Sequence, residues 1–149
     1  MSNFATGVTV VTSPPLPGRA PVGVTISSFT SVSLKPPLIL WCLDRSADTL
    51  PAFREADAFA VNILREEQEI LSTRFSASGD HAFEGVAHVT GSTGAPLLEG
   101  ALARLECRKA AEYDGGDHVI FLGEVLEART WPGEPLLHFR SAYRGLGPG

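Results

Sequence analysis

The sequence has few cysteines, no basic cluster and no long apolar run, and each shortage excludes a class of protein. Cys42 and Cys107 are its two cysteines, and each lies in an apolar or strand-like run. We expect buried thiols in a reducing compartment, with a disulfide between them as the alternative. The net charge of −5 and the absence of a Lys/Arg cluster argue against nucleic acid and anionic membrane surfaces as partners.

Targeting segments and several common site motifs are also missing. No apolar run approaches the roughly 20 residues of a membrane helix, and the N-terminus has no signal-peptide pattern, so we expect a cytoplasmic protein without a membrane contact. There is no G-x-G-x-x-G, no phosphate-binding G-x-x-x-x-G-K-[ST] and no G-x-S-x-G. The four histidines and two cysteines show no ligand spacing, so we expect no metal site.

What remains is the composition of a folded chain of ordinary domain size. The 149 residues are 44% hydrophobic and 19% charged, which disfavours disorder. A chain of this length can bury about 68–70% of its unfolded surface. We find no internal repeat and no linker, and therefore expect one domain over residues 1–149.

Alternating Val, Ile and Thr predict a mainly β protein. The predicted strands are residues 5–13, 19–26, 38–43, 58–64, 102–113, 118–131 and a short piece within 136–143. Two short helices are expected near 48–56 and 65–76, the first capped by Ser46 or Asp48 and the second with Ile70, Leu71 and Phe75 on one face. Residues 77–94 are expected to form a loop, and the order of elements favours an antiparallel barrel over a doubly wound sheet.

A hydroxyl-rich connection lies between two apolar strands in residues 22–43. Thr25, Ser27 and Ser28 open it, Thr30 and Ser31 follow, and a double proline precedes the second strand. Small hydroxyls and backbone amides supply hydrogen-bond donors without bulk, so this stretch can hold a polar ligand. A solvated Ser/Thr turn is the alternative.

A second signal, Arg45-Ser46-x-x-Thr49, follows the strand 38–43. Free amides at a helix start favour anions, and these side chains add one charge and two hydroxyls. Ordinary capping is the alternative, and the carboxylate of Asp48 would compete with a phosphate. Because one strand joins both signals, we expect them to grip opposite ends of one elongated ligand.

Two further signals lie near the end of the chain. Gly116-Asp117-His118 enters a predicted strand, and it is either a plain hairpin turn or a site where the imidazole contacts a phosphate or carboxamide. Tyr143-Arg144 is either a surface pair or part of that site.

These segments together resemble a known family. The resemblance lies in residues 4–12 (FATGVTVVT), 23–29 (GVTISSF), 31–38 (SVSLKPPL), 59–64 (FAVNIL), Gly116-Asp117-His118 and 136–140 (LLHFR). The chain is similar to the flavin reductase-like domain, and within it to the short-chain reductases of two-component flavin monooxygenases. The resemblance spans nearly the whole sequence, and its combination of motifs is specific.

The resemblance implies a fold, an activity and partners. It implies an antiparallel, Greek-key-like, FMN-binding split β-barrel with two or three short helices, forming a homodimer. It implies an enzyme, an NAD(P)H:flavin oxidoreductase that passes a hydride from NADH or NADPH to FMN or FAD, so that reduced flavin can supply a partner monooxygenase. No side chain need act as nucleophile or general base, because the cofactors carry the chemistry.

The resemblance also implies roles for residues of this sequence. Thr25, Ser27 and Ser28 would hold the isoalloxazine edge, and Arg45, Ser46 and Thr49 the phosphate. The helix end at Phe75 and Ser76 would approach the flavin, while His118 and Tyr143 would border the nicotinamide. Lys35 has no role in this layout, and we expect it to be exposed.

Two points leave alternatives open. Family members usually carry a helical segment before the Phe-Ala-Thr-Gly-Val run, whereas this chain begins at Met1-Ser2-Asn3. A non-catalytic flavin- or haem-binding module on the same barrel is the rival interpretation, and a pyridoxamine-phosphate-oxidase-like enzyme matches these motifs less well.

Overall fold

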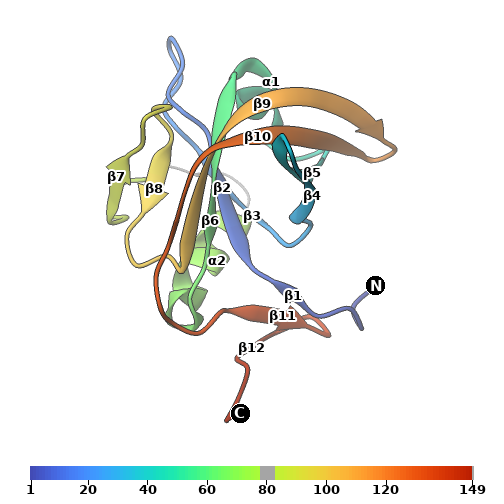
Figure 1. Cartoon of the computed structure of the whole chain (residues 1–149), viewed down its shortest axis with the longest axis vertical. Coiled ribbons are helices and arrows are strands. Elements are labelled where there is room, and N and C mark those ends of the chain that lie inside the picture. The colour runs from blue at the N-terminus through green and yellow to red at the C-terminus, as the bar shows by residue number, and fades with distance from the viewer. Residues whose placement is uncertain (78–82, 149) are drawn as a thin grey trace.

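A computed structural model describes residues 1–77 and 83–148 (Figure 1). Its strands are β1 (Thr6–Gly7), β2 (Thr9–Thr12), β3 (Gly23–Ile26), β4 (Thr30–Leu34), β5 (Pro37–Asp44), β6 (Ala58–Ile63), β7 (His88–Thr90), β8 (Pro96–Leu98), β9 (Ala103–Gly115), β10 (His118–Thr130), β11 (Leu137–Phe139) and β12 (Ala142–Arg144). Its helices are α1 (Leu50–Glu55), the 3₁₀ turn η1 (Glu66–Gln68) and α2 (Glu69–Ser76).

Seven strands form one antiparallel sheet in the order β3-β2-β6-β9-β10-β5-β4. The long β9–β10 hairpin runs through its middle and curves, with register shifts after Leu122 and after Val125 (Figure 1). Such irregularities bend a strand and increase its twist. The predicted mainly β architecture is therefore confirmed, and so are the two short helices.

An aromatic cluster fills the space that the curved sheet encloses. Trp41 of β5 stacks on Phe121 of β10 with ring centroids 4.7 Å apart. The rings of Phe53 and Phe59 meet Trp41 edge-on at 4.9 Å and 5.5 Å. All four side chains are buried, and such aromatic pairs stabilise a fold beyond their buried area alone. This cluster holds β5 in place, and the candidate site lies at the end of β5 that contains Asp44.

A second apolar cluster lies where α2 packs against β2 and β3. Phe75 is fully buried there with Val10 and Leu64, and its ring lies 5.1 Å from that of Phe83. Gly23 allows this approach, because a Cβ at that position would lie only 3.0 Å from the Phe75 ring. The end of α2 is thereby held against β3.

A small sheet, β1-β11-β12, joins the two ends of the chain. Thr6 pairs with His138, and His138 pairs with Tyr143 on its other side. This sheet lies below the main body in Figure 1 and brings the N-terminal segment next to the C-terminal strands.

Four sequence-based predictions of local structure were wrong. The expected connection after Ser28 contains the edge strand β4, and the expected loop 77–94 contains β7, although its residues 78–82 lie outside the described part. Thr49 is the N-cap of α1 in place of Ser46 or Asp48. Ile70 is 82% exposed, so it does not share the buried face of α2 with Phe75.

The other predicted strands are present with changed bounds: the expected strand 5–13 is divided into β1 and β2, and the expected strand 19–26 begins only at Gly23. β2 and β3 form the expected hairpin, and the turn between β9 and β10 falls at Gly116 and Asp117. Lys35 is exposed, as expected. Within the described chain, no helix has the length and apolar character needed to cross a membrane.

Candidate functional site

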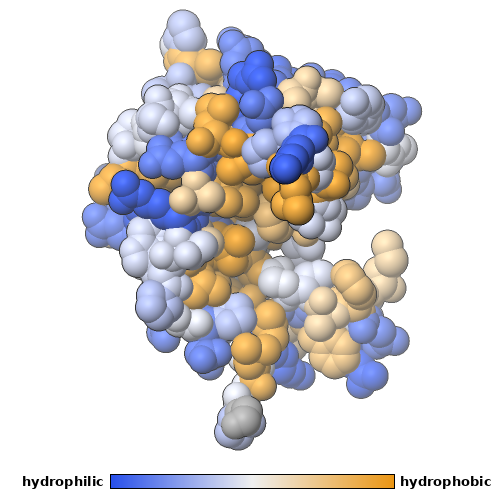
Figure 2. Space-filling view, viewed as in Figure 1, coloured by the Kyte–Doolittle hydropathy of each residue, from blue (hydrophilic) through white to orange (hydrophobic). Residues whose placement is uncertain are grey.

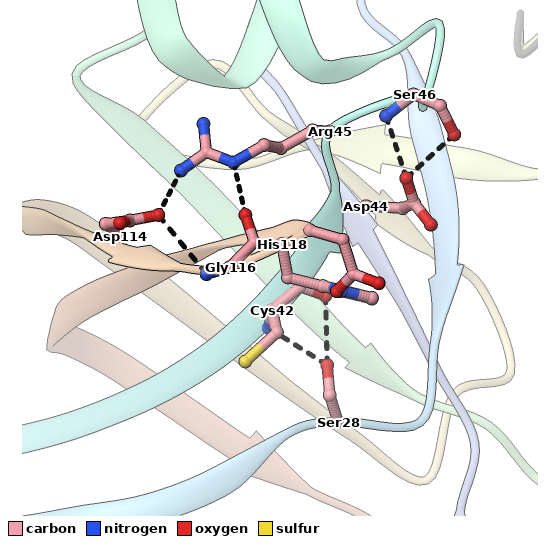
Figure 3. A network of polar contacts seen from close by, with 9 residues as sticks. Ser28, Cys42, Asp44, Arg45, Ser46, Asp114, Gly116 and His118 are labelled. Carbon is pink, nitrogen blue, oxygen red and sulfur yellow. Dashed lines mark hydrogen bonds and ion pairs between the residues drawn. The ribbon is translucent and has the colours of Figure 1, made fainter.

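The β4–β5 hairpin brings the hydroxyl-rich stretch to the end of β5. Thr30, the first residue of β4, pairs with Leu40 in the middle of β5, so the residues before β4 lie beside the last residues of β5. The Ser28 hydroxyl accepts a hydrogen bond from the Cys42 amide at 2.9 Å and donates to the Cys42 carbonyl at 3.0 Å (Figure 3). The hairpin therefore places Ser28 beside Cys42, near the end of β5 that leads into Arg45 and Ser46. The expectation that the two signals bind opposite ends of one ligand remains a prediction.

A cavity of about 430 Å³ opens at this end of β5. It lies between the β3 segment, the loop into α1 and the end of α2. Its lining residues are Val24, Thr25, Asp44, Ser46, Ala47, Asp48, Thr49, Phe75, Ser76 and Ala77. Five of the predicted site residues thus line one cavity, although they come from three separate parts of the chain.

In this cavity the Asp44 carboxylate accepts hydrogen bonds from both the amide and the hydroxyl of Ser46. Its Oδ1 atom accepts hydrogen bonds from the Ser46 amide at 2.8 Å and the Ser46 hydroxyl at 2.7 Å (Figure 3). These two bonds, and to a smaller degree the charge of His118, lower the pKa of the Asp44 carboxyl below its ordinary value. Asp44 is therefore a carboxylate at neutral pH.

Arg45 lies next to Asp44 but is directed to another part of the structure. Its Nε donates to the Gly116 carbonyl at 2.7 Å, and its guanidinium pairs with Asp114 at 2.5 Å. Figure 3 shows the guanidinium pointing toward the β9–β10 turn, away from the Asp44–Ser46 pair. The hydrogen bond from Arg45 lowers the pKa of Asp114. Arg45 thus ties the loop after β5 to that turn.

His118 begins β10 directly opposite Asp44. The two residues are paired across β5 and β10, and the His118 Nδ1 lies 2.7 Å from the Asp117 carboxylate. The His118 side chain is 41% exposed, so the imidazole is accessible to solvent or to a ligand. Its predicted place beside the ligand remains a prediction.

Ser72 joins three of the predicted site residues, and the sequence reasoning missed it. Its carbonyl accepts hydrogen bonds from the hydroxyls of Thr25 and Ser76, both at 2.7 Å. Its own hydroxyl lies 2.6 Å from the phenol oxygen of Tyr143. Ser72 is fully buried. The spacing of Ser72 and Ser76 by one helical turn was the available signal.

A larger cavity of about 800 Å³ opens beside the hydroxyl-rich stretch. It lies between β1, the N-terminal segment and the start of β4, and Figure 2 shows the hollow with apolar N-terminal residues along its lower side. Its lining residues are Met1, Ser2, Phe4, Ala5, Thr6, Gly7, Thr9, Ser27, Ser28, Phe29, Thr30, Ile63 and His138. This mainly apolar space, with hydroxyls on one side, suits a flat ring system.

A comparison with protein families agrees with this geometry. The model of the flavin reductase like domain matches residues 1–147. The chain belongs to this family. The family resemblance seen in the sequence is therefore confirmed.

Curated relatives match the chain over most of their own length. The chain is 46% identical over 140 residues to the FMN reductase (NADH) SmoA of Agrobacterium fabrum, covering 94% of this chain and 79% of that protein. It is 43% identical over 152 residues to an NADH-dependent FAD reductase of Streptomyces globisporus, covering 98% and 82%. It is 35% identical over 151 residues to the reductase subunit HsaB of a flavin-dependent monooxygenase of Mycobacterium tuberculosis, covering 99% and 80%.

A solved structure gives the same result for the fold. The Streptomyces globisporus NADH:FAD oxidoreductase SgcE6, in complex with NAD and FAD fragments, superimposes with a TM-score of 0.93 at 42% identity. The match covers 99% of this chain and 88% of that one. The split-barrel fold expected from the sequence is confirmed.

The groups that line the two cavities suit a flavin. The Thr49 hydroxyl is buried and has no hydrogen-bond partner among the residues that the structure describes, which marks a place where a ligand oxygen can satisfy it. Ser46, Thr25 and Ser76 add hydroxyls nearby. Asp44 and Asp48 are the features that oppose a phosphate, because both carboxylates line the same cavity.

Proposed function

We propose that this protein is an NAD(P)H:flavin oxidoreductase. It transfers a hydride from reduced nicotinamide to FMN or FAD. The observation that carries this assignment is the match of nearly the whole chain to the flavin reductase like domain. Its relatives include proteins named for NADH-dependent reduction of FMN and of FAD, which favours catalysis over a binding module that holds a flavin or haem without turnover.

The residues of the chain bind and orient two flat rings. Bound flavin supplies the hydride acceptor and reduced nicotinamide the donor. Ser27 and Ser28 present the hydroxyl side of the larger cavity to the ring, and Thr25 lines the smaller one. The Ser28 hydroxyl is already bonded to Cys42, so its contribution is to fix the backbone around the ring. Water exclusion and orientation then lower the barrier.

The phosphate of the flavin is assigned to the smaller cavity. Ser46 and Thr49 line it, with Phe75 and Ser76 at the end of α2. Arg45 also remains in the proposed set, but its guanidinium must leave Asp114 to reach a phosphate. His118 and Tyr143 are assigned to the nicotinamide side.

A partner and a location follow from the same assignment. Some relatives are named as reductase components of monooxygenases. We therefore propose that this protein passes its reduced flavin to a partner oxygenase. Both cysteines are free, which supports a reducing, cytoplasmic location.

A homodimer is part of the proposal. Exposed apolar side chains at Met1 and Phe4 border the larger cavity, and a second copy of the chain would cover them. We expect light scattering during size exclusion to give twice the 15.8 kDa mass of one chain. A mass of one chain at micromolar concentration contradicts the dimer.

The activity is tested by following NADH and NADPH absorbance with added FMN and then FAD. Oxidation that depends on added or bound flavin supports the oxidoreductase. No oxidation with either flavin, together with a yellow protein, identifies a flavin-binding module instead. A Soret band in the visible spectrum identifies a haem-binding one.

A further inference from the structure

Asp44 places a negative charge in the cavity assigned to the flavin phosphate. Its side chain lines that cavity together with Ser46 and Thr49. Asp48 lines it too, so the cavity contains two acidic side chains. A phosphate that enters this space meets side chains of like charge, and this repulsion weakens binding.

Asp44 also uses the donors that a phosphate needs. The Ser46 amide and hydroxyl both donate to the same oxygen, Oδ1 of Asp44. Each group has one proton to give, so neither can donate to a phosphate while the pair is intact. A phosphate must displace the Asp44 carboxylate, which leaves that carboxylate without two hydrogen bonds.

Of the neighbouring basic side chains, only His118 acts on this charge, and its effect is small. Arg45 is held by Asp114 and the Gly116 carbonyl, on the side of the loop away from Ser46 (Figure 3). His118 faces Asp44 across the strands, but its Nδ1 contacts the carboxylate of Asp117. The anion site therefore has hydroxyl donors and no committed cation among these neighbours.

We propose that Asp44 is a specificity-determining residue that weakens the hold on the flavin phosphate, so that this protein selects flavins by the ring and exchanges them readily. This inference rests on the proposed flavin reductase function and deepens it. Its consequence is a small difference in affinity between riboflavin, which lacks the phosphate, and FMN, which carries it.

Equilibrium binding tests the proposal without catalysis. Quenching of flavin fluorescence gives the Kd of riboflavin and of FMN for the wild type and for Asp44→Asn. Asparagine keeps the acceptor oxygen for Ser46 and removes the charge, so we expect the Kd of FMN to fall about fivefold while that of riboflavin changes less than twofold. Asp44→Ser, which removes the charge with a smaller side chain, should shift FMN in the same direction.

Glu127→Gln is the matched control, because it removes one carboxylate from β10 at a distance from this cavity. It should leave the ratio of the two Kd values unchanged. An unchanged or weakened affinity for FMN in both Asp44 variants overturns the proposal, and so does an equal change for FMN and riboflavin. If the wild type binds neither flavin and oxidises no NADH, the proposed function itself fails. If it does both and the ratio does not move, this inference alone fails.

Discussion

Asp44 at the end of β5 and Arg45 directly after it point to opposite sides of the loop and have different partners. On one side Asp44 accepts both donors of Ser46, and on the other Arg45 pairs with Asp114. The Asp114 side chain is 81% exposed, and exposed ion pairs contribute little to stability. The value of the Arg45 contact is therefore positional: it keeps the guanidinium at the β9–β10 turn.

His118 is the residue whose assignment is most directly testable. We expect His118→Ala to raise the apparent KM for NADH about five- to tenfold, since one polar contact to the nicotinamide side is lost. The Kd of flavin should stay within twofold. Steady-state kinetics at saturating flavin and fluorescence titration measure the two quantities.

His88→Ala is the control for this prediction. His88 lies on β7, where its Nδ1 contacts the Val86 carbonyl and its ring packs against Phe83. Its loss should lower stability and leave the KM for NADH unchanged. An unchanged KM in His118→Ala removes His118 from the nicotinamide site.

At the scale of elements, Ser28 fixes the edge of the β4–β5 hairpin. Its hydroxyl bonds both the amide and the carbonyl of Cys42. We expect Ser28→Ala to speed hydrogen exchange at the Cys42 amide by about fivefold, because one net hydrogen bond is worth about 1 kcal/mol. Ser31→Ala, on β4 of the same hairpin, is the control. Equal exchange rates in both variants would show that the backbone pairing alone protects this amide.

The contact between α2 and the C-terminal strand is carried by one hydroxyl pair. Ser72 and Tyr143 meet at 2.6 Å, and Ser72 also accepts from Thr25 through its carbonyl. We expect Ser72→Ala and Tyr143→Phe each to lower the free energy of unfolding by about 1 kcal/mol. The double variant should lose less than the sum, because both changes remove the same bond. Urea unfolding of the four proteins measures this coupling, and full additivity refutes it.

The elements that the sequence predicted well are those with a strong local signal. β6 is apolar except for Asn62, and the β9–β10 turn at Gly116 and Asp117 lies between two strand patterns. The strand β4 was missed because it is an exposed edge strand rich in Ser and Thr, and polarity there resembles a loop. The bonds between Ser28 and Cys42 depend on this hairpin, so they could not be predicted from the sequence either.

The hydrogen-bond partners of the site residues could not be predicted from local sequence, because the partners lie far apart along the chain. Arg45 and Asp114 are 69 positions apart, and Thr25 and Ser72 are 47 apart. The resemblance to a family identified the residue types around a flavin, but it did not show which hydroxyls are already engaged. That Ser46 donates to Asp44 follows only from the folded loop.

At the scale of the whole molecule, Cys107 is buried in the main aromatic cluster. Because of this burial, we expect the free energy of unfolding to fall at alkaline pH. Cys107 is fully buried, next to Phe59 across β6 and β9. Burial, with a smaller effect from the charge of Glu106, raises the pKa of the Cys107 thiol from 9.0 to about 12. Cys42 is raised by burial as well, against an opposing hydrogen bond from Ser28.

The folded state therefore keeps a proton that the unfolded state loses above pH 9. Because the unfolded chain then binds fewer protons, the free energy of unfolding falls as pH rises from about 9 toward 12, by up to about 1.4 kcal/mol per pH unit from this one group. Cys107→Ala should be less stable at pH 7 because it leaves a gap, yet its stability should fall less steeply between pH 9 and 10.5. Urea unfolding at several pH values, with Cys42→Ala as the second variant, measures the difference in slope. Parallel curves for the wild type and Cys107→Ala would mean that this thiol does not govern the alkaline limit, because every other titrating group is common to both proteins.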